Sequence, residues 1–97
     1  ENVYPAEIES VILAHAGVTE VAVIGQPSDI WGESPFAVVV RNEDSLTEAD
    51  IVNHCDGKLA RFKLPKGVTF IDAIPRNANG KVLKKDLRKQ FPGPATD

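Results

Sequence analysis

The chain has 97 residues, of which 42% are hydrophobic and 26% charged, as expected for one globular domain with a single core and no deep cavity of its own. No apolar run is long enough to span a membrane, we expect no signal peptide, and the single Cys55 excludes an internal disulfide. We therefore expect a cytoplasmic protein and, because the chain opens at Glu1 instead of Met, a piece of a longer polypeptide.

The net charge of -3 conceals two oppositely charged parts. Residues 1–57 contain eleven acidic side chains and one basic one, a net charge of -10, whereas residues 58–97 contain ten basic and three acidic ones, a net charge of +7. A separate basic half favours a polyanionic ligand, but lysines on a solvated face would produce the same pattern. The charge distribution alone leaves both interpretations open.

Apolar periodicity, capping residues and turn residues predict elements of both kinds. In chain order they are a helix over 5–16, a strand over 19–24, a break over 26–29, a loop over 30–33, a strand over 35–40, a helix from 47 towards 65, a strand over 68–71, a turn over 75–80 and a helix over 84–90. The strand over 35–40 is apolar on both faces and is therefore expected at the centre of the sheet. Thr47 is the expected cap of the second helix, and Cys55 belongs to its buried stripe. The order α-β-β-α-β-α predicts an α+β fold, with a small sheet of about three strands covered by helices.

The segment Pro75–Arg88 carries the clearest chemical signal. Residues 77–80 form a turn in which Asn and Gly can take positive φ, and this turn is expected to present Lys81 outward on a mobile tip. An ammonium group held in this way suits a ligand that develops negative charge on oxygen. The Gly-Lys pair is not a P-loop, because the spaced upstream glycine and the following Ser or Thr are missing.

Five blocks together resemble the C-terminal domain of the adenylate-forming superfamily, which includes acyl-CoA synthetases and the adenylation domains of peptide synthetases. In the family's order they are ENVYPAEIE at 1–9, GVTEVAVIG at 17–25, DIWGE at 29–33, FKLPK at 62–66 and PRNANGKVLKKDLR at 75–88. The resemblance covers residues 1–91, interpreted as a mobile lid domain, and leaves 92–97 as a disordered tail. It implies a large N-terminal domain, absent here, that binds a carboxylic acid and ATP with Mg²⁺.

The resemblance also implies two poses of the lid, each presenting different residues to the N-terminal domain. In the first, Lys81, with Gly80 and Arg76 supporting its turn, closes over the acid and the α-phosphate while acyl-adenylate forms. In the second, CoA displaces AMP, and the residues implied to contact CoA are Trp31, Phe62, Lys63 and Lys66, with Asn2 at the pantetheine tunnel. Leu64 stands where at least one CoA ligase of the family carries arginine, so a strong phosphate contact is missing there.

Each assignment has a plainer alternative. These are packing for the aromatic residues Trp31 and Phe62, a solvated face for Lys63, Lys66 and Lys81, and helix entry for Asn2. His15 and His54 have no metal-like partners in the sequence, so no metal site is expected in this chain. Both histidines are interpreted as ordinary surface or cap residues.

The leading interpretation is the lid of an AMP-forming ligase that converts an acid, ATP and CoA into acyl-CoA, AMP and pyrophosphate, with the isolated domain inactive. One alternative is the lid of a domain that loads a carrier protein, which the Leu64 departure favours. Another is a non-catalytic module that binds anions or nucleic acid, which the acidic overall charge disfavours. The resemblance further implies reversible acetylation of Lys81 by an acetyltransferase and a deacetylase. The acid itself is not specified by this chain.

Overall fold

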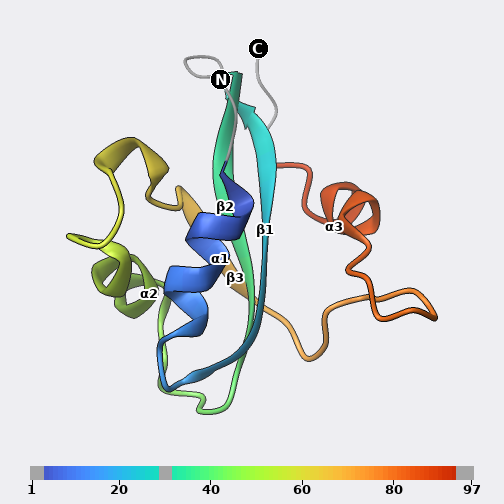
Figure 1. The fold of residues 1–97 in the computed structure, drawn as a ribbon, viewed down its shortest axis with the longest axis horizontal. Helices are drawn as coiled ribbons and strands as arrows, with labels where there is room; N and C mark the ends of the chain where they lie inside the picture. Colours follow the sequence, from blue (N-terminus) through green and yellow to red (C-terminus); the bar gives the residue numbers. More distant parts are fainter. Residues whose placement is uncertain (1–3, 29–31, 94–97) are drawn as a thin grey trace.

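The computed structural model describes residues 4–28 and 32–93, and in these ranges the chain forms helices on both faces of a mixed sheet (Figure 1). The elements are α1 (Pro5–Leu13), β1 (Val18–Ser28), β2 (Gly32–Arg41), α2 (Glu48–Cys55), the 3₁₀ helix η1 (Arg61–Lys63), β3 (Gly67–Phe70) and α3 (Lys84–Gln90). The predicted α-β-β-α-β-α order and the α+β class are confirmed.

The sheet has the strand order β1-β2-β3, with β1 antiparallel and β3 parallel to the central β2. The predicted break over 26–29 is wrong for residues 26–28, which continue β1 and pair with residues 32–34 of β2. The predicted loop over 30–33 is therefore also wrong at its last two residues. Pro27 is tolerated because β1 is an edge strand, which needs only one side of its backbone for pairing.

Two predicted helices end earlier than expected. α1 ends at Leu13, and the chain turns back where the Gly17 N–H donates to Nδ1 of His15 at 2.9 Å. A Cβ at Gly17 would lie 3.2 Å from His15 and Leu46 side-chain atoms, so close packing rather than positive φ requires glycine there. α2 ends at Cys55 instead of continuing towards 65, because Gly57 takes a φ of 85° that a helix cannot accommodate.

The start of α2 follows the prediction in detail. Thr47 Oγ1 accepts a hydrogen bond from the Asp50 N–H at 3.2 Å, and Asp50 Oδ2 accepts one from the Thr47 N–H at 2.9 Å. This reciprocal capping box satisfies two backbone donors that a helix start leaves unpaired. The backbone hydrogen bond from Thr47, followed by its side-chain bond, lowers the pKa of Asp50.

The sheet has a hydrophobic core on each face, which explains why β2 is apolar on both (Figure 1). On one face, α1 and α2 bury Ile8, Ile12, Val18, Val23, Ala37, Val39, Leu46, Ile51, Cys55 and Leu59. On the other face, α3 and the segment before it bury Ala22, Ile24, Val38, Ile74 and Leu87. Burial raises the pKa of the Cys55 thiol, in keeping with its predicted place in the core.

Helices long and apolar enough to cross a bilayer do not occur in the part of the chain that the structure describes.

Candidate functional site

The Lys81 segment is a short hairpin that projects from the α3 face of the sheet (Figure 1). Arg76 and Val82 form an antiparallel bridge, and the Leu83 N–H donates to the Pro75 carbonyl at 2.9 Å. Lys81 accepts at its carbonyl from the Asn77 N–H, also at 2.9 Å. The hairpin is therefore closed by backbone hydrogen bonds on both sides of its tip.

The tip of the hairpin is organised by the side chain of Asn77. Its Oδ1 atom accepts from the N–H groups of Asn79, at 2.9 Å, and Lys81, at 3.0 Å. Gly80 takes a φ of 84°, but no asparagine in the described ranges has positive φ, so the expectation of positive φ at Asn is wrong. In place of a positive φ at asparagine, the carboxamide oxygen of Asn77 shapes the turn. The Asx-turn tendency of asparagine was the sequence signal for this role.

Lys81 is exposed, and its ammonium group makes no hydrogen bond or ion pair with any residue that the structure describes. Arg76 anchors the hairpin instead. Its Nη1 donates to the Gly80 carbonyl at 2.9 Å, and its Nη2 lies 3.2 Å from Oε1 of Glu20 in β1. The cation at 81 is thus free for an external anion, whereas the cation at 76 is bound within the domain.

Phe62 and Lys63, two of the residues predicted to contact CoA, belong to η1, which lies beside α1 on the other side of the sheet. Phe62 is 62% exposed, which rules out burial in the core, and its ring meets that of Tyr4 edge-on at 6.5 Å between centroids. Lys63 Nζ lies 2.7 Å from Glu7 Oε1 and 4.4 Å from the centroid of Tyr4. Lys63 is therefore restrained by side chains of its own domain.

Lys66 differs from Lys63 although both belong to the same block. Its N–H donates to the Pro35 carbonyl at 2.8 Å, which joins the segment to β2, but its exposed ammonium group has no partner among residues 4–28 and 32–93. Leu64 packs against the α1–α2 core. Asn2 and Trp31, the remaining predicted contacts, lie outside the described residues.

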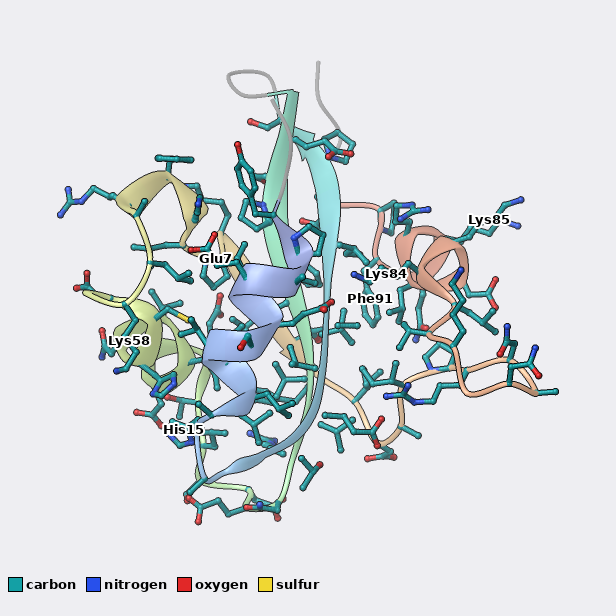
Figure 2. All side chains as sticks on the ribbon, viewed as in Figure 1. Glu7, His15, Lys58, Lys84, Lys85 and Phe91 are labelled. Atoms are coloured by element: carbon teal, nitrogen blue, oxygen red, sulfur yellow. The ribbon has the colours of Figure 1, made fainter. Side chains whose placement is uncertain are left out.

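Glu9 connects the two faces across the edge of β1. Its Oε2 atom accepts from the Val23 N–H at 2.9 Å and lies 2.8 Å from Nζ of Lys84 in α3. Figure 2 shows Lys84 directed towards the sheet and Lys85, the next residue, directed away from the domain. This link holds α3, and with it the Lys81 hairpin, in a defined position relative to α1.

An open groove of about 580 Å³ runs along the same edge, between α1 and α3. Its lining includes Tyr4, Glu7, Glu33, Lys84 and Arg88, and among the described residues it contains none that is predicted to act on substrates. Phe62, Lys66 and Lys81 lie on exposed surface, so they need another surface to complete a site.

The structure provides little for a metal ion. Groups of three or more His, Cys, Asp or Glu side chains able to hold one are absent from the described ranges. His15 and His54 have ring centroids 5.0 Å apart, and each is hydrogen-bonded to backbone, His15 to Gly17 and His54 to Val11.

The fold and the exposed lysine hairpin define a small α+β domain with candidate residues on both faces of its sheet. The sequence profile of the AMP-binding enzyme C-terminal domain matches residues 7–81, and the chain belongs to this family. Known relatives include the long-chain-fatty-acid–CoA ligase FadD13 of Mycobacterium tuberculosis, 57% identical over 94% of this chain, and the 2-succinylbenzoate–CoA ligase of Bacillus mycoides, 46% identical over 92%.

Solved structures agree with the sequence relatives. A Mycobacterium tuberculosis fatty acyl CoA synthetase superposes with a TM-score of 0.88 at 56% identity over 95% of this chain. MatB from Rhodopseudomonas palustris with ATP bound also gives 0.88, at 49% identity over 95%. The chain spans only 18% of the length of each of these four proteins.

Proposed function

We propose that this chain is the lid domain, over residues 1–91, of an AMP-forming acid–CoA ligase. The enzyme would join a carboxylic acid to ATP, releasing pyrophosphate, and then transfer the acyl group from AMP to the sulfur of CoA. One observation supports the proposal above the others: the unpaired Lys81 ammonium and the Phe62–Lys66 block lie on opposite faces of one sheet. A domain built in this way can serve two steps by turning a different face to its partner.

In the first step, the carboxylate attacks the α-phosphate, so two anions approach one another. The Lys81 ammonium, projecting from the hairpin, would offset that repulsion and the charge that builds on oxygen in the transition state. An unpaired lysine suits this task, because no internal ion pair has to break before it meets the reacting phosphate.

In the second step, the opposite face would meet CoA. The exposed Phe62 ring offers an apolar surface for the adenine, and Lys66 an unpaired cation for a phosphate. Lys63 would contribute less, since Glu7 already neutralises it. Trp31 and Asn2 remain further proposed contacts, Trp31 with CoA and Asn2 with its pantetheine arm.

The remainder of the enzyme would supply what this chain lacks. The acid pocket, most ATP contacts and the site for the Mg²⁺ that accompanies ATP belong to the proposed N-terminal domain, because the described residues offer no metal-binding cluster. The isolated chain is accordingly expected to be inactive. We place the enzyme in the cytoplasm, where acids, ATP and CoA are available together.

The decisive experiment separates the two half-reactions in the full-length enzyme. Lys81→Ala should slow acyl-adenylate formation, followed as pyrophosphate release, by about 10²- to 10³-fold, as the loss of one transition-state contact does. Thioester formation from supplied acyl-adenylate and CoA should be spared. Lys85→Ala is the matched control, because Lys85 is exposed and points away from the domain (Figure 2). Equal loss of both half-reactions in Lys81→Ala would refute the assigned role.

CoA is the acceptor that the relatives support, since they are named as CoA ligases. The carrier-protein alternative rests on Leu64 alone, and the nucleic-acid alternative gains no support from the relatives. Titrating the full-length enzyme with CoA and, separately, with a phosphopantetheinylated carrier protein tests the choice. Saturation by the carrier at concentrations where CoA gives no product would overturn it.

The exposed position of Lys81 also makes it accessible to a lysine acetyltransferase and a deacetylase. Acetylation would remove the charge and stop adenylation. Mass spectrometry of the enzyme from its native host, grown on different carbon sources, should show a modified fraction at Lys81. Complete absence of modification would contradict this regulation.

A further inference from the structure

We infer that Asn77 is a positioning residue for the first half-reaction, because its carboxamide sets the direction in which Lys81 leaves the hairpin. The inference rests on the proposed role of Lys81. A single oxygen atom of Asn77, Oδ1, accepts hydrogen bonds from the N–H groups of Asn79 and Lys81, which flank Gly80. No other side chain in the described ranges bonds to the Lys81 backbone.

Four hydrogen bonds inside the tip involve Asn77. Besides the two at Oδ1, its N–H donates to the Lys81 carbonyl at 2.9 Å, and its carbonyl accepts from the Gly80 N–H at 2.9 Å. The backbone of Lys81 is thereby held at both its N–H and its carbonyl by the same residue. The Cα–Cβ direction of a residue follows from its backbone, so Asn77 determines where the long, unrestrained side chain starts.

The same geometry shows why a specific residue is needed here. Gly80 takes a φ of 84° with nothing within 4 Å of an added Cβ, so packing does not shape the tip. The exposed tip has no buried core to hold it, and hydrogen bonds are its only internal restraint. Loss of the Oδ1 acceptor would leave the Asn79 and Lys81 N–H groups to water and let the tip take other conformations.

A matched control lies two residues away. Asn79 has the same side chain in the same exposed turn, but within the described ranges its carboxamide makes no hydrogen bond. Asn77→Asp keeps an oxygen acceptor at the same position and should preserve the turn, since both residue types form Asx turns. The three variants Asn77→Ala, Asn77→Asp and Asn79→Ala therefore isolate the acceptor from the size and polarity of the side chain.

The experiment uses the full-length enzyme with ATP and the best acid from a panel of fatty acids and 2-succinylbenzoate. Asn77→Ala should lower kcat for pyrophosphate release about tenfold, because a displaced catalytic group loses its attack geometry. The KM for ATP should stay within about twofold of the unsubstituted enzyme, as expected when an interaction acts only in the transition state. Asn79→Ala and Asn77→Asp should have a kcat close to that of the unsubstituted enzyme. Thioester formation from supplied acyl-adenylate should be unaffected in Asn77→Ala, Asn77→Asp and Asn79→Ala.

A double-mutant cycle then distinguishes positioning from general damage. If Asn77 acts through Lys81, adding Asn77→Ala to Lys81→Ala should cause no further loss of adenylation. A further tenfold loss, or an Asn77→Ala rate equal to that of Asn79→Ala, would overturn the inference while leaving the role of Lys81 intact. If Lys81→Ala itself adenylates normally, the proposed function fails instead, and the two failures are told apart in one data set.

Discussion

Lys81 and Lys63, one on each candidate surface of this domain, are held in opposite ways. Around Lys81, hydrogen bonds fix the backbone while the side chain is left without a partner. Around Lys63, the side chain itself is held, by Glu7 at 2.7 Å and by the ring of Tyr4. The first arrangement suits a cation that must reach into another domain, and the second suits a surface that is already formed before a ligand arrives.

The most direct test of this difference measures the same half-reaction, adenylation, in variants of both lysines. Besides the loss of adenylation given above for Lys81→Ala, we expect Lys63→Ala to leave adenylation unchanged, because Lys63 lies across the sheet from the hairpin. Pyrophosphate release measured for both variants of the full-length enzyme tests this. A loss of adenylation in Lys63→Ala approaching that of Lys81→Ala would show that the two faces do not act separately.

The next largest effect is expected on the stability of the domain, from the packing of α3 against the sheet. Leu87 is fully buried on the α3 face, and Leu87→Ala should lower the free energy of unfolding by roughly 3 kcal/mol through lost burial and a residual cavity. Urea unfolding of the 97-residue chain, followed by circular dichroism, measures this. Leu13→Ala is the matched control, because Leu13 is 51% exposed and should change stability little. Equal effects of both substitutions would contradict the assigned core.

A smaller effect should distinguish Lys63 from Lys66, the two lysines of the proposed CoA surface. Lys66→Ala should raise the KM for CoA about fivefold, whereas Lys63→Ala should raise it less, because an exposed ion pair already engages Lys63. Glu7→Gln should lower the KM for CoA, because it removes the ion pair that engages Lys63. Steady-state kinetics with varied CoA checks all three. A larger effect of Lys63→Ala than of Lys66→Ala would show that Glu7 does not restrain Lys63.

The smallest expected effect concerns the cap at the start of α2, whose residues belong to neither candidate surface. Thr47→Ala should cost about 1 kcal/mol of stability at neutral pH by removing the helix cap. The lowered pKa of Asp50 means that its ionised form contributes stability above its ordinary value of 3.8, and that this contribution is lost as the pH falls below it. Urea unfolding at neutral pH and below 3.8 should therefore show the difference between Thr47→Ala and the unsubstituted chain narrowing in acid. A stability difference that widens in acid would contradict the stabilising contribution of ionised Asp50.

Much of the fold could be predicted because its signals are local. The Thr47 cap, the central position of the apolar strand and the limits of the last helix all depend on residues close together in sequence. The early end of α2 is also local, at Gly57, but the other misplaced ends depend on distant contacts. Pro27 continues β1 only because that strand lies at an edge, and the turn after α1 places Gly17 where an added Cβ would lie only 3.2 Å from the Leu46 side chain.

For the candidate site, the sequence already indicates which side chains are chemically suited: a lysine after a glycine turn, and an aromatic residue among lysines. Which of these cations are free depends on the folded arrangement of the chain. Lys63 is neutralised by Glu7 and Arg76 by Glu20, in each case a residue 56 positions away in the chain. Ion pairs of this kind form across elements that folding brings together, so no local pattern reports them. The hydrogen bonds within the exposed tip that carries Lys81, in contrast, join residues no more than four positions apart.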